Sequence, residues 1–205
     1  METSPPSYAR KSSHKSNAIA PKRQRGRERV ALILDAASSL FAEKGVEGAT
    51  MTEIAARSGT AIGSLYRFFP TRESIAITLL ERFIEDRLDL LDRMHEELGP
   101  GALDAAAELL MNAWLEKREE RDVTTMLMAT RSDAGHYTAQ WRSQFLERVV
   151  RILERVTPDK AETAPARGVV VLHVLKLAPQ LVTGSLGGEI EKELRQVVLG
   201  LVRGA

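Results

Sequence analysis

The residues with the greatest capacity for chemistry lie together at positions 58–75, in the segment SGTAIGSLYRFFPTRESI. The hydroxyls of Ser64 and Tyr66 can bind phosphate oxygens, and Arg67 can bind either a phosphate or the edge of a guanine. Gly63 has no side chain, so the backbone can come close to a nucleic acid at this point. Taken singly, such residues are usually core or surface residues, but their combination favours nucleic-acid contact.

The rest of the sequence has no pattern typical of catalysis. The four histidines, at positions 14, 95, 136 and 173, do not have the spacing of metal ligands. The absence of cysteine excludes thiol catalysis, a disulfide framework and Cys-based zinc sites. No glycine-rich phosphate loop and no nucleophile elbow is present. We therefore predict no catalytic residue, no metal and no cofactor, and we do not expect an enzyme.

Charge is distributed unevenly along the chain, although its net charge is only +1. Residues 1–72 contain 12 Lys and Arg against 6 Asp and Glu, whereas residues 73–205 contain 17 against 22. A basic N-terminal third indicates contact with a polyanion, although a solvated basic tail would give the same count. There is no secretory signal and no run of about 18 apolar residues, so we expect a cytoplasmic protein without membrane contact.

Residues 1–24 are rich in Ser, Pro, Lys and Arg and have almost no apolar periodicity. This composition predicts a disordered basic arm. Such an arm can follow DNA phosphates or enter a minor groove, and it can equally be an inert tail.

A long helix is predicted over about residues 27–44, ahead of the 58–75 segment. Apolar residues recur within it at helical spacing, and Gly45 follows as a stop signal. A second, shorter helix begins after Thr50, which forms the pattern of a capping box with Glu53. This helix ends at Gly59.

A third short helix is predicted over about residues 61–68. Pro70 ends it, because proline disfavours helical geometry in the residue before it, and Thr71 can cap the next helix. Two short helices joined by a tight turn and braced by a longer one have the layout of a helix-turn-helix, whose second helix lies in the major groove of DNA. Leu65, Phe68 and Phe69 would face the core of this head. The residues predicted to face outward are Ala61, Ile62, Gly63, Ser64, Tyr66 and Arg67.

The segment ILDAASSLFAEKGVEGATMTEIAARSGTAIGSLYRFFPTRESI resembles the DNA-binding domain of the tetracycline-repressor (TetR) family. The motifs LFAEKG, T..EIA..SG and GSLYRFFPTRES occur in the order and spacing of the family, and the resemblance covers about residues 27–80. It implies an all-helical dimer with an N-terminal DNA-binding head and a larger C-terminal domain for ligand binding and dimerisation. Members of the family are mostly repressors that a small molecule releases from operator DNA.

The resemblance also implies which residues contact DNA. By motif position they are Thr50, Thr52, Ala61, Ile62, Gly63, Ser64, Tyr66, Arg67 and Arg72. Two positions depart from the family pattern. Ala61 stands where Ser or Thr often caps the recognition helix, so Thr60 is expected to cap it one residue earlier. Ile62 stands at an often polar position, and it can touch a thymine methyl but cannot hydrogen-bond a base. Direct base readout would then be sparse, with more weight on phosphates and DNA shape.

The C-terminal part is predicted to be helical over about residues 72–97, 102–119, 122–131, 137–156, 166–184 and 188–203. The segment 166–184 is apolar on nearly every face, so it must be covered on all sides. Its natural cover is the core on one side and a partner subunit on the other, although a plain buried core helix is the alternative. The predicted dimer-interface residues are Val170, Leu172, Val174, Leu177, Ile190, Leu194, Val197 and Leu201.

A ligand pocket in this part could be lined by methionine and aromatic residues, which suit an adaptable apolar site. The same residues are ordinary core residues, so both interpretations stay open. The candidates are Trp114, Met126, Met128, Tyr137, Trp141 and His173.

Together these predictions describe an all-α protein of about nine helices. It would consist of a basic arm (1–24), a helix-turn-helix DNA-binding domain (25–71) and a ligand-binding and dimerisation domain (72–205). The expected function is a transcriptional repressor that binds palindromic double-stranded operator DNA as a homodimer and is released by a small apolar or amphipathic effector. An effector-independent dimer controlled by a protein partner, or an activator, would be the alternatives.

Overall fold

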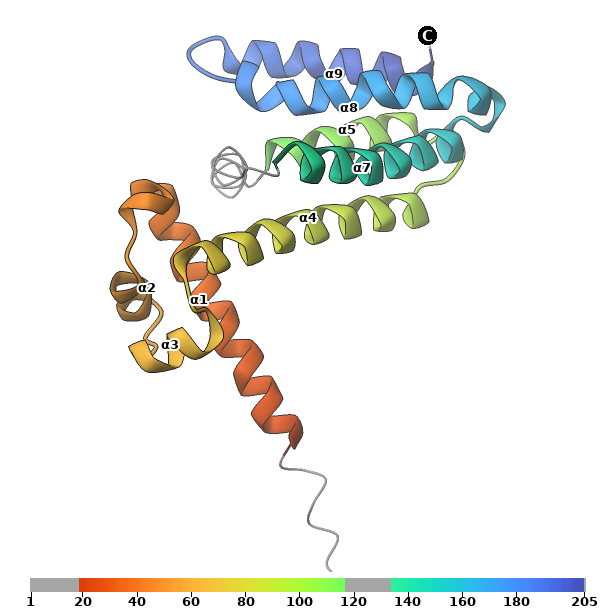
Figure 1. The fold of residues 1–205 in the computed structure, drawn as a ribbon. Coiled ribbons are helices and arrows are strands. Elements are labelled where there is room, and N and C mark those ends of the chain that lie inside the picture. Colours follow the sequence, from red (N-terminus) through yellow and green to blue (C-terminus); the bar gives the residue numbers. More distant parts are fainter. Residues whose placement is uncertain (1–18, 117–133, 205) are drawn as a thin grey trace, which may run out of the picture.

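The computed structural model describes residues 19–116 and 134–204. All regular structure in these ranges is helical, as predicted (Figure 1). The helices are α1 (Ile19–Gly48), α2 (Met51–Arg57), α3 (Ile62–Phe68), α4 (Arg72–Glu97), α5 (Leu103–Leu115), α7 (Ala134–Val156), α8 (Ala164–Leu181) and α9 (Gly187–Arg203), with a 3-10 helix, η1 (Pro158–Thr163), between α7 and α8. Of the predicted helices, the one over 122–131 lies outside the described residues.

Helices α1, α2 and α3 and the first turn of α4 surround one core, which we call the head core. Its members come from apolar positions three and four residues apart in α1 and from one or two positions in each of the other helices. Phe41 and Leu65 are completely buried in it, and Phe69 is nearly so. Phe68 is half-buried and packs against the same cluster. The predicted inward side of α3 is therefore confirmed.

Several of the local signals predicted for the head are present in the structure. Gly45 and Gly59 both have positive φ, of 71° and 59°, which a residue with a side chain rarely adopts. Thr50 forms the predicted capping box with Glu53, and Thr71 caps α4. The predicted cap on α3 is wrong. Its N-cap residue is Ala61 without a side-chain hydrogen bond, whereas the buried Thr60 directs its hydroxyl back to the Ser58 carbonyl oxygen at 3.5 Å.

Several helix bounds differ from the prediction. Helix α1 runs to Gly48 rather than residue 44, with Gly45 as a non-helical residue inside it, and the largest difference is at its start. Helix α1 begins at Ile19, so residues 19–24, assigned to the disordered arm, are helical. Pro21 does not prevent this, because a proline in the first turn of a helix removes no internal hydrogen bond. Helix α5 ends at Leu115, where the backbone of Glu116 becomes extended, rather than at residue 119.

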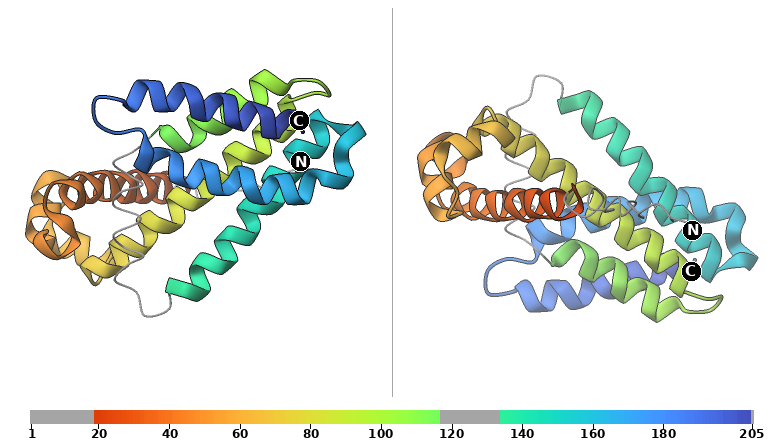
Figure 2. Two further views of the ribbon diagram at one scale, coloured as in Figure 1. Left: turned by 90° about the horizontal axis from the view of Figure 1, so that it is seen from above. Right: turned by 90° about the horizontal axis from the view of Figure 1, so that it is seen from below.

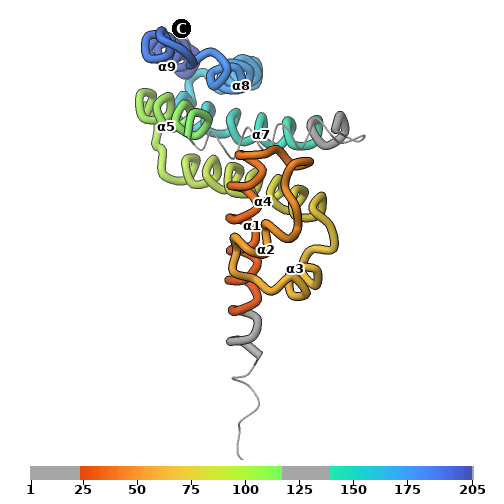
Figure 3. The backbone as a smooth tube through the Cα atoms, turned by 90° about the vertical axis from the view of Figure 1, so that its left-hand side faces the viewer, coloured from red at the N-terminus to blue at the C-terminus, as the bar shows by residue number. Residues whose placement is uncertain are grey.

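Helices α4, α5, α7, α8 and α9 form the second part of the molecule, which we call the body. In Figure 1, α8 and α9 form an upper layer, α5 and α7 lie below them, and α4 runs beneath α7 toward the head; Figure 3 shows the same order from the side. Views from above and below place the head at one end of α4 (Figure 2). The body has its own core, which begins at Leu80, one turn after Ala76 of the head core. Helix α4 is thus shared by both cores.

Candidate nucleic-acid interface and ligand cavity

The outer face of α3 lies on the surface of the head, and no other helix of the described residues covers it. Ala61, Gly63 and Arg67 are exposed, and the exposed fractions of Ile62 and Tyr66 are 43% and 51%. Ile62 and Tyr66 are four residues apart, so they are neighbours on one side of the helix. Ser64 is half-buried. Of the predicted recognition residues, Ile62, Gly63, Tyr66 and Arg67 therefore share the exposed side of α3.

Thr50 and Thr52 lie at the start of α2, and both are exposed. The Thr50 hydroxyl is engaged within the protein, because it accepts from the Glu53 backbone N–H at 3.2 Å and donates to the Glu53 carboxylate at 2.9 Å. Lys44 lies 2.5 Å from the same carboxylate. Hydrogen bonds from Lys44 and then from Thr50 lower the pKa of Glu53 to about 2. DNA contact by Thr50 and Thr52 stays a prediction.

Arg72 is also engaged within the protein. Its guanidinium donates to the carbonyl oxygens of Glu47 and Ala49 at 2.8 and 3.3 Å and forms ion pairs with Glu47 at 2.7 Å and Glu73 at 3.2 Å. These bonds tie the start of α4 to the connection between α1 and α2. The structure thus gives Arg72 a bracing role, and its predicted contact with DNA stays untested.

Two further arginines brace the helix-turn-helix, and the sequence analysis missed both. Arg57 of α2 forms two hydrogen bonds with the carboxylate of Glu43 of α1, at 2.5 and 2.9 Å. This pairing lowers the pKa of Glu43 and raises that of Arg57. Arg29 donates to the carbonyl oxygen of Gly59 in the turn at 3.3 Å. These partners are 14 and 30 residues apart, so no local pattern predicts them.

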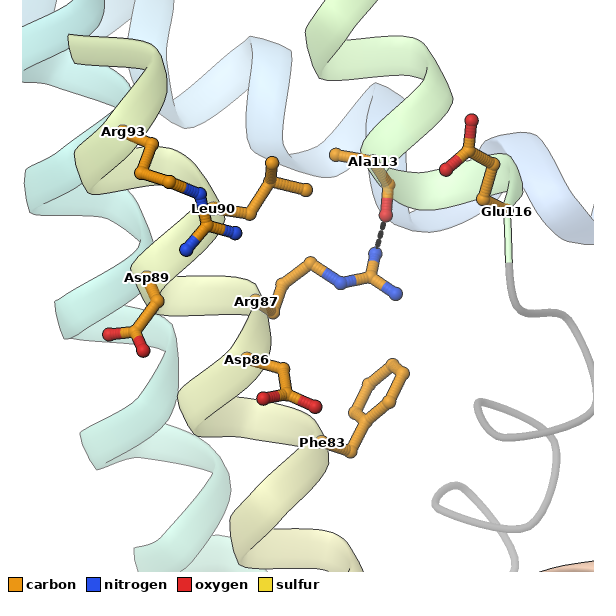
Figure 4. Close-up of a pocket in the computed structure, with 8 residues that line it drawn as sticks. All are labelled: Phe83, Asp86, Arg87, Asp89, Leu90, Arg93, Ala113 and Glu116. Carbon is orange, nitrogen blue, oxygen red and sulfur yellow. Dashed lines mark hydrogen bonds between the residues drawn. The ribbon is translucent and has the colours of Figure 1, made fainter. Parts of the chain in front are cut away.

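A cavity of about 340 Å³ opens between α4 and the end of α5 (Figure 4). Its lining residues are Phe83, Asp86, Arg87, Asp89, Leu90, Arg93, Ala113 and Glu116. Arg87 is only 7% exposed, and it donates a hydrogen bond to the carbonyl oxygen of Ala113. Its guanidinium lies 4.7 Å from the ring centre of Phe83 and 5.3 Å from that of Trp114, at distances typical of cation–π contacts. The other four charged residues are exposed. The cavity therefore combines apolar side chains with a buried cation and an exposed charged rim.

Of the predicted pocket residues that the structure describes, none lines this cavity. Trp114 is buried in the body core, with its ring centre 5.7 Å from that of Phe145 and the two rings steeply inclined, and Trp141 packs against the same core. His173 was predicted wrongly, because it is exposed on the outer side of α8. Met126, Met128 and the side chain of Tyr137 lie outside the described residues. The cavity was missed because its charged residues on α4 have the sequence pattern of a solvated helix face.

The outer sides of α8 and α9 carry an apolar face that no other described helix covers. Val169, Val170, Leu177 and Leu181 of α8 and Val197 of α9 are exposed. The remaining predicted interface residues, Val174, Ile190, Leu194 and Leu201, are half-buried along its edges. Leu172 is an exception among the predicted residues. Only 1% of it is exposed, because it points into the body core, so it cannot contact a partner.

Neither a metal site nor a membrane span emerges from the ranges 19–116 and 134–204. No group of three side chains suited to metal binding comes together in them. None of their helices combines the length and the apolar character that crossing a bilayer requires.

Comparisons with known proteins agree with this geometry. Residues 33–79, which include α2, α3 and the start of α4, match the family model described as bacterial regulatory proteins, tetR family. The chain is 36% identical over 77 residues to the HTH-type transcriptional repressor KstR2 of Rhodococcus jostii. This match covers 38% of the chain and 36% of the repressor, so the chain spans about a third of the length of that relative.

Solved structures extend the likeness to the whole fold. PfmR, a TetR-family regulator of Thermus thermophilus, superposes with a TM-score of 0.63 at 21% identity, over 83% of this chain and 97% of PfmR. FadR of Bacillus subtilis, solved in complex with stearoyl-CoA, superposes with a TM-score of 0.62 at 17% identity, over 85% of this chain and 98% of FadR. The head of this chain, residues 33–79, thus matches the tetR family model, and the described helices have the same fold as these two regulators.

Proposed function

We propose that this protein is a transcriptional repressor that binds palindromic operator DNA as a homodimer and is released by a small-molecule effector. The observation that carries the proposal is the outer face of α3, where Ile62, Tyr66 and Arg67 project from a head that several arginines brace. A short exposed helix of this kind fits the major groove, and a braced head can hold it at a fixed angle. The name of KstR2, a transcriptional repressor, supports the same function.

Dimerisation is supported by the apolar face on α8 and α9. Exposed neighbours such as Val170, Leu177 and Val197 would remove apolar surface from water if a second copy covered them. A two-fold pair of subunits also supplies two copies of α3. Two recognition helices about one helical turn of DNA apart would read a palindromic site.

Release by an effector is supported by the position of the cavity. Phe83, Arg87 and Leu90 line it from α4, and the same helix packs into the head core through Ile75 and Ala76. Only about 10 Å of helix separates Ala76 from Phe83. A ligand that binds better to a state with a shifted α4 would favour that state, in which the spacing of the heads no longer fits the operator. The size of the shift in this equilibrium is set by the ratio of the ligand's affinities for the shifted and the DNA-binding states.

The cavity also indicates the character of the effector. Its walls combine Phe83 and Leu90 with charged groups, which suits an amphipathic molecule. FadR, which has the same fold, was solved with stearoyl-CoA, a molecule that has both an apolar chain and charged groups. We propose an effector of this amphipathic kind, held between α4 and α5.

Replacing Tyr66 with Ala tests the DNA-binding part of the proposal. About half of this side chain is exposed, so its loss should leave the fold intact while it removes a contact with the operator. A single contact is typically worth about 1–3 kcal/mol, so affinity should fall by roughly 5- to 100-fold in fluorescence anisotropy on a selected duplex. Arg151→Ala, on exposed α7 surface, is the control and should bind as the wild type does. Unchanged affinity of the Tyr66→Ala protein would refute this role of α3.

A further inference from the structure

The first turn of α3 has an unusual composition for a helix that would enter the major groove. Ala61, Ile62 and Gly63 have no hydrogen-bonding atom in their side chains. In a helix-turn-helix, the N-terminal residues of the recognition helix are the ones that contact base edges. These three residues therefore cannot discriminate between bases by side-chain hydrogen bonds; the hydroxyl of this turn belongs to the half-buried Ser64, and Arg67 lies at the other end of the helix.

Ile62 is placed to make an apolar contact instead. Its side chain is 43% exposed and lies one turn from Tyr66, which is 51% exposed. In the major groove, the one apolar feature that differs between bases is the C5-methyl group of thymine. A branched aliphatic side chain that packs on that methyl group removes apolar surface of both groups from water. A polar side chain at the same position would remove less apolar surface.

Gly63 provides a second, independent observation. A Cβ atom added to it would have nothing within 4 Å, and its φ is not positive. Neither space nor backbone geometry within the protein therefore requires glycine here, although glycine weakens a helix relative to alanine. What glycine provides at this exposed position is a helix surface that another molecule can approach closely.

We infer that the first turn of α3 recognises a thymine in each operator half-site through its C5-methyl group, with Ile62 as the contacting side chain and Gly63 providing the close approach. This inference rests on the proposed operator binding and names the base feature that the first turn reads. It predicts a requirement for thymine at one position of each half-site. A cytosine, which lacks the methyl group, would be discriminated against even though Ile62 forms no hydrogen bond with its base pair.

The test uses the full-length protein and a duplex recovered from a random-sequence library by selection on that protein. Each thymine of the duplex is replaced in turn by deoxyuridine, which removes one methyl group and keeps the base-pairing hydrogen bonds. At one position per half-site, wild-type affinity should fall about three- to fivefold, as expected for one buried methyl group. The Ile62→Ala protein should bind the thymine duplex more weakly than the wild type and should not distinguish thymine from deoxyuridine at that position.

Ile77→Ala is the matched control, because Ile77 is a similarly exposed isoleucine on α4. This protein should retain the wild-type response to deoxyuridine. Wild-type binding that no deoxyuridine substitution weakens, or an Ile62→Ala protein that keeps the wild-type response, would overturn the inference while operator binding itself stands. Failure of the selection to enrich any duplex would instead contradict the proposed function, and the inference with it.

Discussion

Some residues of the head are placed to contact DNA, and others hold its helices together. Tyr66 and Arg67 lie on the outer face of α3, where their side chains are exposed, so their loss should change binding and leave the fold intact. Arg57 and Arg29 hold α2 and the turn against α1 instead. Loss of a bracing residue should therefore alter both the stability of the head and the angle of α3.

The capping box of α2 predicts a pH dependence at the residue scale. The folded-state pKa of Glu53 is about 2, lower than its ordinary value of 4.5. A carboxylate whose pKa is lower in the folded state stabilises that state at pH values above its unfolded-state pKa. This stabilisation is lost as the pH falls through the folded-state pKa. The Glu53→Gln protein should therefore melt below the wild type near neutral pH, and the gap should shrink between about pH 4.5 and pH 2.

Thermal melting followed by circular dichroism across this pH range measures the gap. Glu85→Gln, which changes an exposed carboxylate of α4, is the control and should melt with the wild type throughout. A gap for Glu53→Gln that stays constant down to pH 2 would contradict the role of this carboxylate in the cap.

Helix bounds were predictable wherever the signal is local. The capping box at Thr50, the kink of α1 at Gly45 and the turn at Gly59 each depend on one residue or on a pair three residues apart. The start of α1 at Ile19 was not predicted, because no capping residue marks it and the composition there is that of a disordered segment. Bracing contacts such as Arg57 with Glu43 join residues that only the tertiary fold brings together.

Close packing of α7 against α8 gives a prediction at the element scale. A Cβ atom on Gly168 of α8 would lie 2.6 Å from Cγ2 of Val150 on α7, which is closer than packed atoms allow. The Gly168→Ala protein should therefore lose about 1–3 kcal/mol of unfolding free energy. The matched control is Gly63→Ala, because the space around Gly63 is open; it should gain up to about 1 kcal/mol while it binds operator DNA more weakly.

Urea unfolding of both alanine variants and the wild type measures these differences. A Gly168→Ala protein as stable as the wild type would show that the two helices can separate without cost. A Gly63→Ala protein that binds DNA as tightly as the wild type would contradict a close approach at this position.

At the scale of the whole molecule, the sequence did not predict which side of α8 would be exposed. A helix that is apolar all round has no amphipathic direction, so both core and partner contacts were assigned to it. The structure turns Leu172 into the body core and leaves Val170 and Leu177 exposed. The ligand cavity was likewise unpredictable, because Arg87 of α4 is buried through its contacts with α5, which only the tertiary fold brings to it.

Disruption of the exposed face on α8 and α9 should separate the subunits. Leu177 is half-exposed, so Leu177→Glu should leave each subunit folded but place a charge within the proposed interface, where burying it unpaired is costly. Sedimentation should then report a monomer, and operator affinity should fall sharply. Leu109→Glu, on an exposed part of α5, is the control and should remain dimeric. A dimeric Leu177→Glu protein would place the interface elsewhere.

Selection of random-sequence DNA on the purified protein, followed by sequencing of the bound fragments, tests the central claim most directly. The claim is that a dimer presents two copies of α3 to one operator. It predicts enrichment of a short motif in two inverted copies, with centres about one helical turn apart or a multiple of that distance. Fragments without any shared motif, or a motif that occurs in a single unrepeated copy, would contradict it.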